Sequence, residues 1–201
     1  MTDFPPRIAL ATHNPHKLRE LARICADWPT EWVSVENHDP SAFPDVEETG
    51  ATYLDNAKLK AEAVAASSRL PALADDSGIE VDALGGAPGP RSARYAGEHA
   101  SDEENLRALI QAIRGIPASG RSARYRCVAA IAWPDGRFDH AEGACEGMLR
   151  TSPVGSHGFG YDPIFVPIGR DVTMAELSDD EKDRISHRGR AFRGLRELLT
   201  G

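Results

Sequence analysis

Two adjacent carboxylates, Asp75 and Asp76, directly follow the apolar residues Leu73 and Ala74. Burying a charged group is costly unless it is paired or bound to metal, and ligands commonly bind where the strands of α/β folds end. One interpretation is therefore a metal ligand, or a base that activates water. The other is an Asp-Ser-Gly turn whose side chains hydrogen-bond their own backbone. The pattern alone favours neither.

A second acidic pair, Glu47 and Glu48, precedes a segment rich in good helix formers. Mg²⁺ prefers oxygen ligands and usually takes one or two carboxylates together with phosphate oxygens, so adjacent glutamates here are candidate ligands. Taken alone, a charged and solvated loop explains them better. Asn56 and Lys60 lie one helical turn apart and can face the same site, whereas Lys58 and Lys60 cannot both face it.

The segment 12–17, Thr-His-Asn-Pro-His-Lys, joins an apolar run to a helical pattern. Free backbone N–H groups and the helix dipole at such a junction favour a bound phosphate. Asn14 can hydrogen-bond a phosphate oxygen or a base, and Lys17 supplies a positive charge. An Asn-Pro turn followed by a solvated lysine is the simpler interpretation of this segment by itself.

Glycines alternate with Phe159 and Tyr161 in the segment 158–161. Glycine lets the backbone approach a ligand closely, and each aromatic ring can stack on a base, a contact worth about 1–3 kcal/mol. A bulged loop is the alternative, because the glycine pattern alone is weak.

Ser186, His187 and Arg188 stand at the start of a predicted helix. Together they can donate several hydrogen bonds to a base edge or a phosphate. Cations are unfavourable at a helix N-terminus, and such a local conflict points to function. A basic surface helix is the alternative, because Arg190 and Arg193 continue the positive charge.

Alternating strands and helices must position these segments, which predicts one α/β domain over residues 1–201 with a mixed sheet. The segment 73–81 reads as a strand, a tight turn over 75–78 and a second short strand. Asp135 and Gly136 predict a hairpin turn. The other predicted strands are 7–11, 31–35, 124–133, 138–149 and 164–166, and the predicted helices are 52–68, one that a capping box begins at 101–104, and 188–199.

The composition excludes several classes of protein. The chain has 23 Lys and Arg against 31 Asp and Glu, a net charge of −8, which disfavours a nucleic-acid-binding module because that affinity depends on cationic side chains. Three cysteines without CxxC spacing indicate neither a disulfide framework nor a zinc site. No signal peptide and no membrane-spanning run is evident. We therefore expect a cytoplasmic protein that binds neither nucleic acid nor membrane.

Together and in this order, the segments resemble the inosine triphosphate pyrophosphatase family, which acts on non-canonical purine nucleotides. The resemblance runs from near residue 10 to past residue 190. It rests on LATHNPHKLREL, EETGATYLDNAKLKAEA, LADDSGIEVDALGGAPGPRSARYAGE, GFGYDPIF and AELSDDEKDRISHRGRA.

The resemblance implies roles for particular residues. Asp76 matches the proposed proton acceptor, and Glu47 and Asp76 match carboxylates associated with Mg²⁺, although Mn²⁺ suits the same ligands. His187 and Arg188 match the end of the pocket that reads the purine. The full set of expected substrate contacts is Thr12, His13, Asn14, Pro15, His16, Lys17, Lys60, Ser77, Phe159, Gly160, Tyr161, Asp162, Lys182, His187 and Arg188.

The family's fold and reaction are also implied. The expected fold is a long twisted mixed β-sheet flanked by helices, in two lobes with a central substrate cleft, and the expected assembly is a homodimer. The expected reaction converts ITP, dITP or XTP to the monophosphate and pyrophosphate. Family members often have Gly where this chain has His13, which can crowd a phosphate or add a contact. The alternatives are a pyrophosphatase for other modified nucleotides and a non-catalytic nucleotide-binding protein.

Overall fold

The computed structural model describes residues 4–201, which form an α/β fold around a sheet in the order β2-β1-β3-β4-β5-β6. β1 is parallel to β2 and β3, and β5 is antiparallel to β6, so the predicted mixed sheet flanked by helices is confirmed. The strands are β1 (Arg7–Leu10), β2 (Glu31–Val33), β3 (Ala72–Val81), β4 (Ser122–Ala132), β5 (Phe138–Leu149) and β6 (Phe165–Pro167). The helices are α1 (Pro15–Ile24), α2 (Tyr53–Ser68), α3 (Asp102–Ile113), α4 (Asp179–Ile185) and α5 (His187–Thr200).

The chain divides into two compact units. Unit 1 comprises the chain up to Asp76 together with Cys127–Gly143 and Arg188–Gly201, and unit 2 comprises Ser77–Arg126 and Ala144–His187. Strands β3, β4 and β5 contribute residues to both. Within residues 4–201, no helix is long and apolar enough to cross a membrane.

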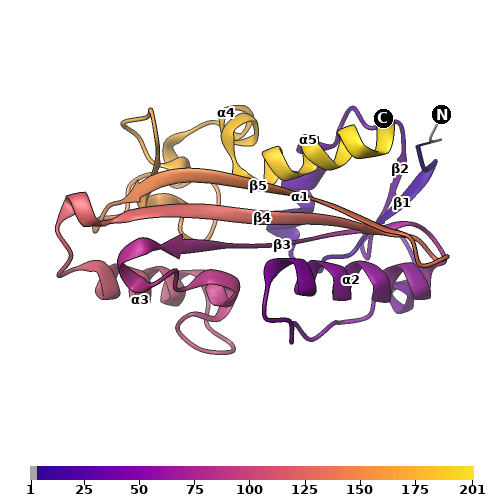
Figure 1. The fold of residues 1–201 in the computed structure, drawn as a ribbon, viewed down its shortest axis with the longest axis horizontal. Coiled ribbons are helices and arrows are strands. Elements are labelled where there is room, and N and C mark those ends of the chain that lie inside the picture. Colours follow the sequence, from indigo (N-terminus) through magenta and orange to yellow (C-terminus); the bar gives the residue numbers. More distant parts are fainter. Residues whose placement is uncertain (1–3) are drawn as a thin grey trace. The chain divides into compact units, whose positions relative to one another are not determined.

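In unit 1, helices cover both faces of the strands. Leu21 of α1 and Phe192 of α5 pack in one buried cluster with Leu73 of β3. Val64 of α2 belongs to another cluster, which contains Ala74 of β3. Figure 1 shows α2 on the opposite side of the strands from α5. Because successive side chains of a strand point to opposite faces, Leu73 faces α1 and α5 while Ala74 faces α2.

Unit 2 has an apolar core of its own. Leu109 and Ile113 of α3 are fully buried against Ile79 of β3, together with Phe165 of β6 and Met174. Helix α3 begins with the predicted capping box, in which the Ser101 side chain accepts from the backbone N–H of Glu104. β3 therefore contributes buried side chains to a core in each unit.

The predicted turn over 75–78 is wrong, because β3 runs without interruption from Ala72 to Val81. The turn was inferred because Asp, Ser and Gly are typical turn residues. Two buried aspartates are costly within a strand, and the structure meets that cost by pairing Asp75 with side chains from α1 and α5 and Asp76 with side chains from α2. The residues therefore keep strand geometry, and the hairpin predicted at Asp135 and Gly136 separates β4 from β5 as expected.

Candidate active site

The two aspartates of β3 point to opposite faces of the sheet. The Asp75 side chain points to the same face of the sheet as Leu73 and contacts side chains from α1 and α5. The Asp76 side chain points to the same face as Ala74 and contacts side chains from α2. Both side chains are nearly inaccessible to solvent. Adjacent carboxylates of one type therefore meet different partners, all within unit 1.

Asn56 connects Asp76 to the acidic loop that precedes α2. This fully buried side chain donates from Nδ2 to Asp76 Oδ2 at 3.1 Å and accepts from the backbone N–H of Gly50 at 2.8 Å. A Cβ at Gly50 would lie 2.6 Å from the Asn56 oxygen, so only glycine allows this approach. The loop that carries Glu47 and Glu48 is thus held beside Asp76.

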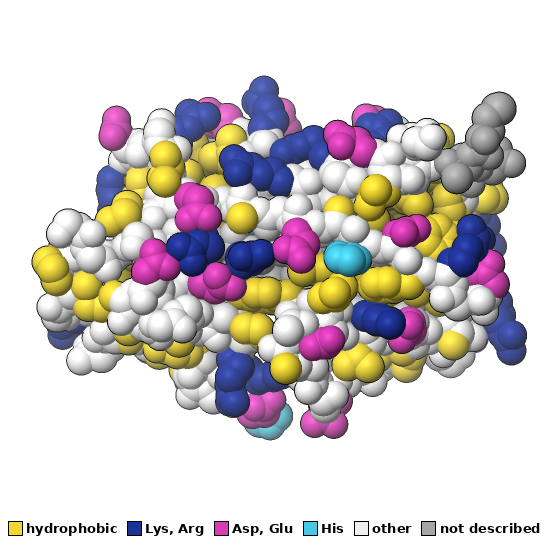
Figure 2. Space-filling view, in the orientation of Figure 1, with side chains coloured by type: hydrophobic (Ala, Val, Ile, Leu, Met, Phe, Trp, Pro, Cys, Tyr) yellow, Lys and Arg dark blue, Asp and Glu magenta, His cyan; other side chains and the backbone are white. Residues whose placement is uncertain are grey.

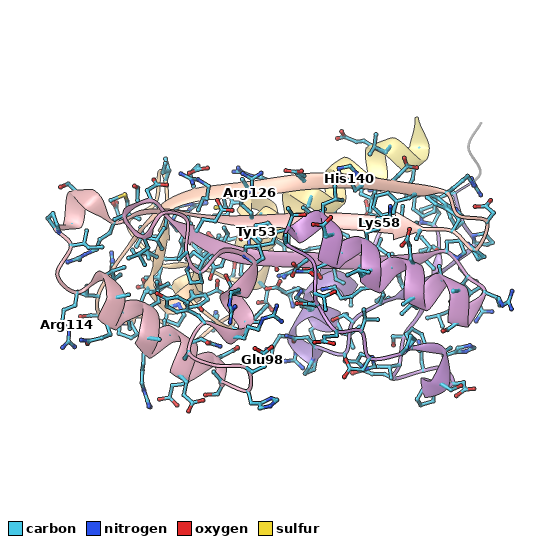
Figure 3. The ribbon with its side chains drawn as sticks, turned by 60° about the horizontal axis from the view of Figure 1, so that its bottom comes forward. Tyr53, Lys58, Glu98, Arg114, Arg126 and His140 are labelled. Atoms are coloured by element: carbon cyan, nitrogen blue, oxygen red, sulfur yellow. The ribbon has the colours of Figure 1, made fainter. Side chains whose placement is uncertain are left out.

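Lys60 lies one turn after Asn56 and supplies the positive charge on this face. Its Nζ lies 2.6 Å from Glu48 Oε1 and 3.9 Å from Asp76 Oδ1. The prediction that Asn56 and Lys60 face one site is confirmed, since both contact Asp76. Lys58 instead pairs with Glu62 and lies over the Phe138 ring of β5. In Figure 3 it leaves α2 on the side of His140, another β5 residue.

On the other face, Asp75 is the centre of an ion-pair network. Its Oδ2 accepts from Lys17 Nζ at 3.1 Å and from Arg188 NH2 at 3.1 Å and Nε at 3.3 Å. Arg188 also donates to Glu20. Arg188 is 1% exposed, and Lys17 and Glu20 lie three residues apart on α1.

The phosphate-loop candidates begin where β1 ends. The backbone N–H of Ala11 donates to Leu73 at 2.7 Å, so the loop leaves the sheet next to Asp75 and Asp76. Asn14 caps α1, since its Oδ1 accepts from the backbone N–H groups of His16 and Lys17. The ring of His16 contacts Arg19. Residues 13–16 are exposed, while Thr12 and Lys17 are half-buried.

Electrostatics separates the two aspartates further. Burial raises the pKa of Asp75, but Lys17 and Arg188 outweigh it and hold that pKa well below the usual range. Burial dominates at Asp76 and raises its pKa, although Lys60 opposes the shift. Burial lowers the pKa of Lys60, and Asp76 and Glu48 reverse this to a net increase. Paired carboxylates with diverging pKa values are typical of sites that divide a proton acceptor from a fixed charge.

Unit 2 holds a second polar cluster, centred on the buried Asp162. Its Oδ2 lies 2.6 Å from Lys182 Nζ and accepts from the Phe159 N–H at 3.0 Å, and its Oδ1 accepts from the Tyr125 hydroxyl at 3.1 Å. Lys182 Nζ also lies 5.2 Å from the centroid of the Phe159 ring. Gly158, at φ +74°, allows the turn, because a Cβ there would lie 2.1 Å from Asp162 Oδ2.

The other predicted base contacts differ in burial and in the residues that surround them. His187 stacks on Tyr125, with ring centroids 4.5 Å apart and an interplanar angle of 7°. Ser77 is half-buried on β3, and the N–H of Gly160 donates to Asp102. The suggestion that Tyr161 stacks on a base is not supported, because this residue is 4% exposed in the unit 2 core and its hydroxyl donates to the Ser92 carbonyl. Phe159, which is half-buried, remains the stacking candidate.

The oxygen donors of unit 1 suit a hard cation that arrives with a phosphate. Asp76 and Glu48 both lie against Lys60, and the exposed Glu47 is their neighbour in the loop. Across the described part of the chain, no group of three or more His, Cys, Asp or Glu side chains is arranged to hold a metal by itself. Mg²⁺ usually takes only one or two protein carboxylates when phosphates supply the rest, so this donor set fits.

Sequence reasoning missed two residues of these clusters and the partners of a third. Glu20 and Tyr125 occur in ordinary helical and strand patterns, and Asp75 was noticed without a partner being found. The sequence offered no signal for Glu20, because its neighbours at helical spacing include His16, Lys17 and Arg23, which indicate an exposed face. Partners 58 and 113 residues away in sequence, as for Asp75, are beyond any local pattern.

Comparison with known proteins places these features in a family. The model of the Ham1 family matches residues 8–198. The chain belongs to the Ham1 family. It is 49% identical over 197 residues to the dITP/XTP pyrophosphatase of Streptomyces avermitilis, covering 96% of this chain and 98% of that protein. It is 43% identical over 190 residues to the Bacillus subtilis dITP/XTP pyrophosphatase, covering 94% and 95%.

Solved structures of Ham1 proteins share the fold. The HAM1 protein from Coxiella burnetii superposes with a TM-score of 0.85 at 40% identity, covering 96% of this chain and 98% of that one. The Staphylococcus aureus Ham1 protein superposes with a TM-score of 0.84 at 39% identity, covering 97% of this chain and 98% of that one. The resemblance predicted from the sequence motifs is confirmed.

Proposed function

We propose that this Ham1 protein hydrolyses non-canonical purine nucleoside triphosphates, such as ITP, dITP and XTP, to the monophosphate and pyrophosphate. Relatives that match nearly its whole length carry the name dITP/XTP pyrophosphatase. The structural observation that supports the proposal best is Asp76, a buried carboxylate with a raised pKa, bonded to Asn56 and close to Lys60.

Lys17 and Lys60 bind the triphosphate in this proposal. Phosphoryl transfer needs positioning and the neutralisation of charge that develops on phosphate oxygens. Both ammonium groups are largely buried, with side chains 14% and 13% exposed. Weak screening by solvent strengthens their attraction for phosphate.

Asp76 orients the attacking water and accepts its proton. The water oxygen bonds to the α-phosphorus, the bond from that phosphorus to the bridging oxygen breaks, and pyrophosphate leaves with the bonding electrons. A general base works best when its pKa is close to the working pH, which agrees with the upward shift at Asp76. Asn56 holds the carboxylate in place through its hydrogen bond to Oδ2.

Glu47 and Asp76 would hold Mg²⁺, and Mn²⁺ suits the same ligands. When bound, the ion polarises phosphate oxygens and lowers the pKa of a coordinated water. The hydrogen bond between Gly50 and Asn56 supports this assignment, because it keeps the loop carrying Glu47 beside Asp76.

The unit 2 cluster recognises the base. Phe159 offers a half-buried ring for stacking, and Lys182 is a fixed donor. Donors directed at the purine 6-keto oxygen are left without an acceptor when adenine presents an amino group, so such a site disfavours ATP. His187, stacked on Tyr125, is a further donor in this proposal.

The assembly follows from the family resemblance alone. We infer a homodimer, to be tested by sedimentation at several protein concentrations. Location in the cytoplasm stays a prediction, to be tested by cell fractionation.

Asp76→Asn tests the proposed role of the carboxylate. We expect ITP turnover to fall by at least about 10³-fold, because the variant keeps the shape but cannot accept a proton. Circular dichroism and the melting temperature serve as the check on folding. Substantial residual turnover by a folded Asp76→Asn variant would remove Asp76 as base.

A further inference from the structure

We propose that Asp75 is a positioning residue that fixes the Lys17 ammonium for the phosphates of the substrate, and that Arg188 and Glu20 hold Asp75 in place. This inference rests on the proposed function only in taking Lys17 as a phosphate ligand. It assigns Asp75 neither proton transfer nor metal binding.

Asp75 holds Lys17 through two of its own atoms. Lys17 Nζ lies 3.1 Å from the carboxylate Oδ2 and 3.4 Å from the backbone oxygen of the same residue. A lysine side chain has several rotatable bonds and loses conformational entropy when it is fixed. Two acceptors on one rigid strand residue define where that nitrogen lies before any phosphate arrives.

Arg188 and Glu20 in turn hold the Asp75 side chain in place. Arg188 reaches Oδ2 through two nitrogens, Nε and NH2, and extends NH1 to Glu20. The four side chains carry two positive and two negative charges, which balances the network in the interior. Because Glu20 belongs to the same helix as Lys17, the network also ties α1 to the strand that carries Asp75.

The geometry separates this role from that of Asp76. Asp75 lies on the face covered by α1 and α5, and its Oδ2 is already shared by two cations. Asp76 lies on the α2 face with Asn56 and Lys60. One aspartate therefore acts on the substrate, and the other acts through Lys17.

The same placement gives Arg188 contacts that the sequence did not suggest. The family resemblance implied that Arg188 reads the purine, and that role stays a prediction. In the structure its guanidinium contacts Asp75 and Glu20, whereas His187, the preceding residue, stacks on Tyr125 in unit 2. Arg188 thus belongs to the Lys17 network.

Inorganic tripolyphosphate, titrated calorimetrically without divalent cation, provides the test. It carries phosphates but no base, and its binding requires no turnover, so an error in the proposed nucleotide leaves the test valid. We expect Asp75→Asn to weaken binding about tenfold, as expected for loss of one charge-assisted hydrogen bond. In a Lys17→Ala background, Asp75→Asn should change the affinity by less than about twofold, because the two residues act as one unit.

The matched control is Glu20→Gln, which alters the network without touching Lys17 directly. It should lower the melting temperature by a similar amount with and without Lys17→Ala. Should Asp75→Asn fail to fold, Asp75→Glu keeps the charge and displaces it, and its loss of affinity should again disappear in the Lys17→Ala background. An equal loss in both backgrounds, or no loss with Lys17 present, would overturn the proposal.

Discussion

At the scale of single residues, neighbouring aspartates acquire opposite properties from their surroundings. Asp75 lies between Lys17 and Arg188, so its pKa falls, whereas burial raises the pKa of Asp76. The residue pattern indicated that charge here must be paired or bound to metal, and the family resemblance implied that Asp76 is the base. The pattern alone could not separate the two aspartates, because their partners are distant in sequence and lie on different helices.

Replacing each aspartate by asparagine should therefore affect the free energy of unfolding differently. At neutral pH we expect Asp75→Asn to lower the free energy of unfolding by about 1.5–3 kcal/mol, because hydrogen bonds to charged partners are lost. Asp76→Asn should leave it unchanged or increase it, since a raised pKa means that ionised Asp76 is less favourable in the folded protein than in the unfolded chain. Urea denaturation of both variants provides the measurement.

The pH dependence follows from the same shifts. A carboxyl whose pKa is depressed by folding stabilises the protein above its unfolded pKa of about 3.9. This contribution declines as the pH falls below that value, since the folded pKa of Asp75 is lower still. The difference in the free energy of unfolding between wild type and Asp75→Asn should thus be largest at neutral pH and smaller toward about pH 2. A difference that grows on acidification would show that Asp75 is not held ionised.

At the scale of elements, β3, which carries Asp75 and Asp76, continues beyond the end of its neighbour β1. β1 pairs with β3 through Ala9 opposite Ala72 and Leu10 opposite Leu73, and β1 ends at Leu10, so the loop after β1 begins close to Asp75 and Asp76. Helix-forming composition predicted α2, an amphipathic pattern predicted α5, and the Asp-Gly turn predicted the β4–β5 hairpin, and all three predictions are confirmed. The prediction failed at residues 75–78, because polar residues within a strand look like a turn until their partners are known.

Gly50→Ala should disturb the acidic loop selectively. The added Cβ would lie 2.5 Å from Asp55 Cβ and 2.6 Å from the Asn56 oxygen, so the loop must move away from α2. We expect the Mg²⁺ concentration for half-maximal turnover to rise about tenfold or more, as is typical when support around metal ligands is lost. Gly115→Ala is the control, since a Cβ there meets nothing within 4 Å. Equal behaviour of the two variants would exclude this loop from the metal site.

Arg188→Ala should be among the most destabilising substitutions in α5. It leaves Asp75 and Glu20 buried with a partner removed, and breaking a buried ion pair in this way lowers stability by about 3–5 kcal/mol. The exposed Arg190 on the same helix provides the comparison, with an expected effect within about 0.5 kcal/mol for Arg190→Ala. Chemical denaturation should separate the two variants, and similar stabilities would mean that the Arg188 network contributes little.

At the scale of the whole molecule, charge is distributed as the sequence suggested. The net charge of −8 makes phosphate attraction a property of local lysines and not of the surface as a whole. On the face drawn in Figure 2, acidic and basic side chains are interspersed. Arg124, for example, pairs with Glu80, Asp82 and Glu146. On this face, the interspersed charges do not form a continuous basic surface of the kind that nucleic acid requires.

The fold class and the family could be predicted from the sequence because motifs near both ends of the chain match in order. The two lobes could be expected from the family resemblance alone, since β3, β4 and β5 run through both units and no linker marks a boundary. The base cluster could not be assembled in detail. Its members Tyr125, Asp162 and His187 are brought together by the packing of unit 2.

Product analysis with a panel of nucleotides tests the central claim most directly. The purified protein would be incubated with Mg²⁺ and, separately, ITP, XTP, dITP, ATP, GTP and dUTP, with Asp76→Asn as the inactive control, and the products separated by chromatography. We predict rapid formation of pyrophosphate with IMP, XMP or dIMP, and little change in ATP or GTP. Hydrolysis of dUTP alone would contradict the purine assignment, and no turnover of any nucleotide with Mg²⁺ or Mn²⁺ would contradict the proposed activity.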